Sequence, residues 1–192
     1  MQLFTIGHST HTIENFINLL KNTGIDTLVD VRSSPYSKYN PQYNKETLKT
    51  SLSAVKINYI FMGEELGARH KEPQVLEADG RVNFEKVREL DTFKKGIERL
   101  KIGMEKGYKI VLMCSEKDPI ECHRFSLVSY ALKKEGVQVK HVLEDGSVVD
   151  NSVLEAGFLN KVPNMFKTKE EEIEEGYKIL ENKVAFVNEV DI

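Results

Sequence analysis

The sequence predicts an α/β protein: a doubly wound, mainly parallel sheet of about five strands with helices on both faces, plus a C-terminal helical appendage. Two observations support this. Short β-rich runs at 3–6, 27–31, 58–62, 109–114 and 137–143 alternate with segments of helical periodicity. These runs are almost continuously apolar, which is typical of strands that helices cover on both faces.

The first expected helix shows the periodicity most clearly, because apolar residues recur at Ile13, Phe16, Ile17 and Leu20. Thr12 is its expected N-cap, and Gly24 is the expected residue just beyond its end. Further helices are expected at 48–55, at 93–104 and at 121–135. The second has Asp91 as its expected cap and Gly107 as its expected end, and the third ends before Gly136.

The chain divides into an α/β domain at 1–146 and an appendage at 147–192 docked on it. The polar connection at 63–89 is long for a compact domain, and loops of that length are usually functional or mobile. In the appendage, Thr168 and Glu171 form a capping-box pattern, and Ile173, Tyr177 and Leu180 form one apolar stripe. We interpret its run of glutamates as a solvated acidic face. The sequence does not predict a role for it.

Composition excludes several broad classes. A net charge of −3 and a pI near 6.0 give no global attraction to nucleic acid or to an anionic membrane. No apolar run is long enough to span a membrane, and the N-terminal residues lack the pattern of a signal peptide. Two cysteines are too few for a disulfide scaffold, so a cytoplasmic location is expected. Cofactors and oligomeric state are left open.

The segment from Cys114 to Arg124 is the best candidate for chemistry, because it holds both cysteines together with His123 and Arg124. It lies between an expected strand and an expected helix, where ligands and anions gather in α/β proteins. In a parallel sheet, two other strand ends would share this edge. The residues that we expect to converge there are His8, Ser9, Asp30, Arg32, Ser34, Cys114, Glu116, Cys122, His123 and Arg124.

The leading hypothesis is an enzyme that binds a phosphate-bearing ligand, either a nucleotide or a nucleic-acid end, in this crevice. The expected catalytic residues are His8, Asp30, Cys114, Glu116, Cys122 and His123. The expected ligand-binding residues are Ser9, Arg32, Ser34, Tyr36 and Arg124. The structural alternative is that each histidine or aspartate is a satisfied polar group, and that Cys114 is a small buried apolar residue.

Two other functions stay open. Between 31 and 45 the basic residues Arg32, Lys38 and Lys45 alternate with tyrosines, so a non-catalytic module could bind nucleic acid or a protein partner through the loop at 36–43. A thiol redox or metal-binding protein could use Cys114 and Cys122. No metal site is predicted, since no Cys-x-x-Cys or His-Glu-x-x-His spacing occurs and the adjacent residues Cys122 and His123 should point apart on a helix.

Several short segments along the chain form a characteristic set. They are Thr5-Ile6-Gly7-His8-Ser9, Asp30-Val31-Arg32 with Pro35, Ser37, Pro41 and Gln42, Glu65-Leu66-Gly67, Met113-Cys114-Ser115-Glu116-Lys117, and Cys122-His123-Arg124. In these segments the chain resembles the uncharacterised DUF488 family. They span about 1–146 in order. The resemblance implies an α/β domain and a shared site at these positions, but no activity. Ala68 stands where the family usually has a second glycine, and the tail after Asp150 lies outside the resemblance.

Overall fold

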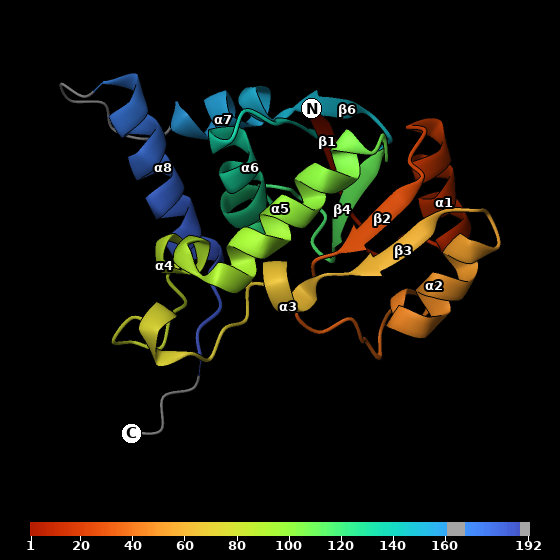
Figure 1. The fold of residues 1–192 in the computed structure, drawn as a ribbon, viewed down its shortest axis with the longest axis horizontal. Helices are drawn as coiled ribbons and strands as arrows, with labels where there is room; N and C mark the ends of the chain where they lie inside the picture. Colours follow the sequence, from red (N-terminus) through yellow and green to blue (C-terminus); the bar gives the residue numbers. More distant parts are fainter. Residues whose placement is uncertain (161–167, 189–192) are drawn as a thin grey trace.

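The computed structural model describes residues 1–160 and 168–188, which form one six-stranded sheet (Figure 1). Its strand order is β3-β2-β4-β1-β5-β6. The first five strands are parallel, and β6 pairs antiparallel with β5. The strands are β1 (Gln2–Gly7), β2 (Thr27–Asp30), β3 (Asn58–Phe61), β4 (Ile110–Cys114), β5 (Gln138–Val142) and β6 (Val148–Asp150). The predicted α/β class is therefore confirmed, and β6 is the strand that the prediction missed.

Helices cover both faces of the sheet, as predicted. The α-helices are α1 (Ile13–Asn22), α2 (Lys45–Ser53), α3 (Gly63–Leu66), α4 (Phe84–Glu89), α5 (Asp91–Glu105), α6 (Tyr130–Lys134), α7 (Asn151–Leu159) and α8 (Lys169–Val184). Alternate residues of β4 face opposite sides, as a strand requires. Val111 and Met113 pack with α1 and α2, whereas Leu112 and Cys114 pack with α3, α4 and α5.

Helix α1 begins and ends where its sequence signals indicate. The Thr12 side chain accepts a hydrogen bond from the Asn15 backbone N–H at 3.2 Å, a cap that contributes about 1 kcal/mol. Gly24 follows with φ +68°, a conformation that glycine adopts without steric cost. In α5, however, Asp91 is the first helical residue rather than the cap, and Leu90 precedes the helix without a side-chain cap bond.

The expected helix at 121–135 is present as a continuous helical segment over 123–134, but its first half is not a regular α-helix. A six-residue π-helix occupies Arg124–Ser129, and α6 then completes the segment. π-Helical turns are rare and often accompany functional sites. This one lies directly after Cys122 and His123.

The long connection at 63–89 is ordered, which corrects the expectation of a structureless loop. It contains α3, a 3-10 turn at Pro73–Val75 and α4, joined by a bridge between Leu76 and Val82. Val75, Val82 and Phe84 are buried in the main core, so apolar packing holds the segment in place.

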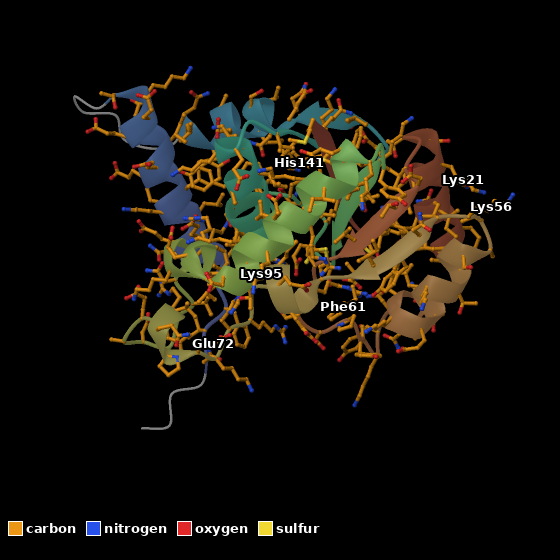
Figure 2. All side chains as sticks on the ribbon, in the orientation of Figure 1. Lys21, Lys56, Phe61, Glu72, Lys95 and His141 are labelled. Atoms are coloured by element: carbon orange, nitrogen blue, oxygen red, sulfur yellow. The ribbon has the colours of Figure 1, made fainter. Side chains whose placement is uncertain are left out.

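The C-terminal part packs closely on the sheet. Asn151, at the start of α7, bonds His141 of β5 at 3.1 Å, and His141 lies inside the molecule, whereas Lys21 and Lys56 project from its periphery (Figure 2). The predicted capping box of α8 is present, and Tyr177 and Leu180 are buried against Phe125 and Tyr130. None of the described helices has the length and apolar character needed to cross a bilayer.

Candidate functional site

Three strand ends meet at the carboxyl edge of the sheet, because β4 pairs with β1 on one side and with β2 on the other. Gly7 lies opposite Cys114, and Asp30 lies opposite Met113. The chain segments remain paired beyond the strands: His8 N–H donates to the Cys114 carbonyl at 2.9 Å, and Ser9 N–H donates to the Ser115 carbonyl at 3.0 Å. Residues from distant parts of the sequence thus share one edge.

The thiol cluster, as we name Cys114, Glu116, Cys122 and His123, occupies the end of β4. The two thiols donate to the same Glu116 carboxylate oxygen, at 2.8 Å from Cys114 and 3.1 Å from Cys122. Nδ1 of His123 lies 3.8 Å from each sulfur. The two sulfurs and the imidazole nitrogen all lie within 4.8 Å of one another.

The orientation of His123 explains this convergence. Its Nε2 lies 3.2 Å from the Val31 carbonyl, which can only accept, so Nε2 carries a proton and Nδ1 is the ring nitrogen that faces the sulfurs. The expectation that Cys122 and His123 point apart is wrong, because both precede the π-helix. The side chain of Cys122 therefore turns toward the same point as that of its neighbour.

Burial and mutual contact shift the pKa of each group in the cluster. The contact in which the Cys114 thiol faces the Cys122 sulfur, together with burial, raises the pKa of Cys114. Burial alone would raise the pKa of Cys122, but the Cys114 thiol and the positive charge of Arg124 lower it below its ordinary value. Burial and the nearby Cys122 raise the pKa of Glu116. Burial alone would lower the pKa of His123, but Cys122 and Glu116 raise it. One buried thiol is thus favoured as thiolate over the other.

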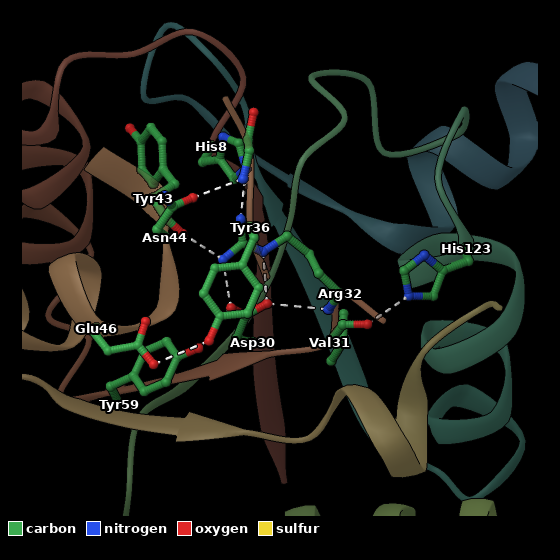
Figure 3. Close-up of polar contacts among 11 residues, drawn as sticks. His8, Asp30, Val31, Arg32, Tyr36, Tyr43, Asn44, Glu46, Tyr59 and His123 are labelled. Carbon is green, nitrogen blue, oxygen red and sulfur yellow. Dashed lines mark hydrogen bonds and ion pairs between the residues drawn. The ribbon is translucent and has the colours of Figure 1, made fainter. Parts of the chain in front are cut away.

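A second group of polar side chains lies at the same edge of the sheet as the thiol cluster. We name it the arginine cluster, and its members are His8, Asp30, Arg32, Tyr43 and Tyr59 (Figure 3). Arg32 holds the Asp30 carboxylate through both of its oxygens, at 2.9 and 2.6 Å, and also donates to the Tyr43 carbonyl at 2.8 Å. The Tyr59 hydroxyl donates to Asp30 at 2.8 Å. The charges of this cluster are therefore neutralised internally.

His8 is a fixed, neutral member of the arginine cluster. Its ring stacks on Tyr43 with centroids 4.1 Å apart. Nδ1 donates to the Ser9 carbonyl at 2.9 Å, and Nε2 accepts from Arg32 at 3.3 Å. Burial, aided by the charge of Arg32, lowers the pKa of His8 to about 4. Ser9 itself has φ 47°, a left-handed backbone that a non-glycine residue adopts at a cost of about 1 kcal/mol or more.

Arg124 is fully buried and organises the turn after β4. Its guanidinium donates to the Glu116 carbonyl at 2.7 Å and to the Lys117 carbonyl at 3.2 Å. Gly7 permits this close packing, because a Cβ there would lie 1.9 Å from the Glu116 oxygen. Arg124 therefore supports the backbone that carries Glu116.

A cleft of about 340 Å³ opens beside the thiol cluster. Of the residues predicted for the site, those lining it are Arg32, Ser34, Cys114, Glu116, Cys122 and His123; those that do not line it are His8, Ser9, Asp30, Tyr36 and Arg124. The other residues of the wall are Ser33, Ala68, Arg69, Ser115, Glu121 and the C-terminal segment Val184–Val187. The prediction did not include these, although the Glu65-Leu66-Gly67 motif ends two residues before Arg69.

The two other pockets described below lack cysteine and histidine side chains in their walls. A groove of about 360 Å³ lies between α4, α5, α6 and α8, and its charged side chains form ion pairs such as Arg88 with Glu181. A wider hollow of about 760 Å³ adjoins the cleft and shares Glu116 and Glu121 with it. Among the described residues, Cys114, Cys122 and His123 form the group of side chains whose ligand atoms are close enough together to hold a metal ion.

The tyrosine loop at 36–43 divides into two parts. Tyr43 is buried in the core, and its hydroxyl donates to the His11 carbonyl at 3.0 Å. Tyr36 is 57% exposed and bonds Glu46, whereas Tyr39 is 94% exposed. Two of the three tyrosines are thus accessible, and the third belongs to the scaffold.

Fold and site together define an α/β protein with a mainly parallel sheet and a buried thiol–imidazole cluster at its carboxyl edge. The chain belongs to the DUF488 family: the model described as "Domain of unknown function DUF488" matches residues 12–131. The match includes the thiol cluster and omits His8 and the C-terminal wall of the cleft. No curated protein and no solved structure matches the chain.

Proposed function

We propose that this protein is a metal-dependent enzyme in which Cys114, Cys122 and His123 hold a zinc-like divalent cation at the base of the cleft. One observation carries the proposal: two sulfurs and an imidazole nitrogen face one another within 4.8 Å. In a tetrahedral site with metal–sulfur bonds of about 2.3 Å and metal–nitrogen bonds of about 2.0 to 2.1 Å, sulfur and nitrogen are about 3.6 Å apart. The two sulfur–nitrogen separations of 3.8 Å are close to that value.

The surroundings of the histidine support metal binding. Metal-ligating histidines usually donate their second ring N–H to a carbonyl or carboxylate, which fixes the tautomer. The Val31 carbonyl accepts that bond from His123 here. Thiolate and imidazole ligands together favour zinc over magnesium or calcium, which prefer oxygen.

Three ligands from the protein leave a fourth position for water or substrate, the arrangement of catalytic rather than structural zinc sites. A substrate could reach the metal from the cleft, whose wall includes Glu116. The cation, when bound, would acidify a water and polarise the substrate. Glu116 would take the proton released as the water oxygen bonds to the electrophilic carbon or phosphorus, and would return it to the leaving group as the old bond breaks. The reaction class is metal-assisted hydrolysis.

Metal titration of the full chain tests the proposal. After treatment with a chelator, the protein should bind one equivalent of Zn²⁺ or Co²⁺, and Co²⁺ should give the sulfur charge-transfer and tetrahedral bands of thiolate ligation. Cys114→Ser, Cys122→Ser and His123→Ala should each weaken binding by more than about 100-fold, because loss of a supporting residue alone typically costs 10 to 100-fold.

His11→Gln is the matched control, since His11 lies outside the cleft and bonds Asn15. It should bind Co²⁺ as the wild type does. Wild-type affinity in Cys122→Ser would rule out the site. If no metal binds and both thiols disappear reversibly on mild oxidation, the redox alternative is correct, because the two sulfurs are close enough to form a disulfide after a small movement.

A further inference from the structure

Arg69 differs from the other arginines of the chain in having no bonded partner for its guanidinium among the described residues. The sequence contains six arginines. Four of them, Arg32, Arg81, Arg88 and Arg99, form ion pairs with carboxylates. Arg124 donates to backbone carbonyls. Arg69 is exposed and lines the cleft beside the thiol cluster. A guanidinium carries five N–H donors, so this side chain offers a free cationic fork to the cleft.

Contacts from two other segments hold Arg69 in place. Its backbone N–H donates to the Ser33 hydroxyl at 3.0 Å, and its guanidinium carbon lies 4.9 Å from the centre of the Phe186 ring. Gly67 allows the chain to approach Ser33, since a Cβ there would lie 2.3 Å from the Ser33 oxygen. The backbone at Arg69 is therefore anchored and its guanidinium rests against an aromatic ring, which restrains the side chain and lowers the entropic cost of binding.

The remaining charges of the cleft wall are accounted for. Glu121 pairs with Lys183 at 3.3 Å, and Glu116 accepts from the two thiols. Arg32 is neutralised by Asp30. Among the described residues of the cleft wall, Arg69 is therefore the cation whose charge is available to a negatively charged ligand.

We propose that Arg69 binds an oxyanion, a carboxylate or phosphate group, of the substrate whose reacting end lies at the metal. The proposal rests on the proposed function and names its substrate class. Planar guanidinium matches two oxygens of either group in a bidentate pair, which lysine cannot do. The phosphate-bearing ligand expected from the sequence belongs to this class, with Arg69 in place of Arg32 and Arg124 as its partner. Arg69 acts here as a specificity residue and takes no part in the bond-breaking step.

Calorimetric titration of the full chain with inorganic phosphate, in the presence and absence of one equivalent of Zn²⁺, tests this role. Wild type should bind phosphate saturably, and Arg69→Gln should weaken binding by about tenfold or more. Arg69→Lys should recover only part of the loss. Lys71→Gln removes a nearby exposed cation that does not line the cleft, and it should bind phosphate as wild type does.

The outcomes separate the two proposals. Absence of binding of both phosphate and formate in both states, or equal anion affinity in wild type and Arg69→Gln, would overturn the role of Arg69. Zn²⁺ affinity is measured on the same variants and should not change. If Zn²⁺ does not bind but phosphate still binds in an Arg69-dependent manner, the anion site holds and the metal centre fails. A parallel titration with formate distinguishes a carboxylate from a phosphate preference.

Discussion

The thiol cluster and the arginine cluster lie at the same edge of the sheet, but they differ in how their polar atoms are satisfied. In the arginine cluster each strong donor meets an acceptor, and the charge of Arg32 is balanced by Asp30 at 2.6 Å. In the thiol cluster the groups that face one another are two sulfurs, a carboxylate and an imidazole nitrogen. Each of these four groups can offer an electron pair to a cation once it has released its proton.

This difference distinguishes the arginine cluster, which supports the fold, from the thiol cluster, which we propose as the functional site. A buried pair that is complete in itself has no need of a ligand, whereas converging lone pairs are stabilised by a cation. One residue couples the two clusters. Val31 lies between Asp30 and Arg32, and its carbonyl fixes the ring of His123. The arginine cluster therefore holds the backbone that orients a metal ligand.

The largest expected effect comes from breaking the scaffold. Asp30→Asn leaves the buried guanidinium of Arg32 without its counter-charge, so the free energy of unfolding should fall by about 3 to 5 kcal/mol. Cys122→Ser, measured without metal, should cost only about 1 kcal/mol. Urea denaturation of both variants checks this. Equal losses would mean that the two clusters do not differ in structural role.

A smaller effect is expected from acid. Burial lowers the pKa of His8 from 6.5 to about 4, so the folded state binds fewer protons than the unfolded state. The stability that this provides is complete above pH 6.5 and is lost as pH falls toward 4, with about 2.5 kcal/mol lost by pH 4.5.

Urea denaturation at pH 7.5 and at pH 4.5 measures this loss. His8→Gln should lose about 2.5 kcal/mol less than wild type between the two values. By NMR, the ring signals of His8 should titrate near 4 and stay unchanged when Zn²⁺ is added, whereas those of His123 should shift. A midpoint for His8 near 6.5 would contradict its place in the buried cluster.

Periodicity predicted the fold well where local signals and tertiary packing agree. Thr12 and Gly24 bound α1 as expected, and the apolar strand runs correspond to β1 through β5. β6 was missed because it has only three residues and follows a turn. The segment at 63–89 looked structureless, since its order comes from burial of Val75 and Val82 against distant parts of the chain.

At the site, sequence indicated the edge of the sheet but not the role of each residue. Arg124 follows the cysteines, yet its guanidinium is used by the carbonyls of Glu116 and Lys117, a contact that spacing does not reveal. The approach of Cys122 to His123 depends on a π-helical turn that helical periodicity does not predict. Arg69 depends on packing against Phe186, more than 100 residues later in the chain.

The smallest effect is expected outside both clusters, at the tyrosine loop. Tyr39 is 94% exposed, so Tyr39→Ala should change the free energy of unfolding by less than about 0.5 kcal/mol and leave Co²⁺ binding unchanged.

Fluorescence anisotropy with a labelled single-stranded oligonucleotide tests the alternative of a nucleic-acid module. Because the loop contributes few cations and the chain carries a net charge of −3, we expect no saturable binding at physiological salt. Tight binding that Tyr36→Ala and Tyr39→Ala abolish, and that Cys122→Ser retains, would move the function from the thiol cluster to this loop.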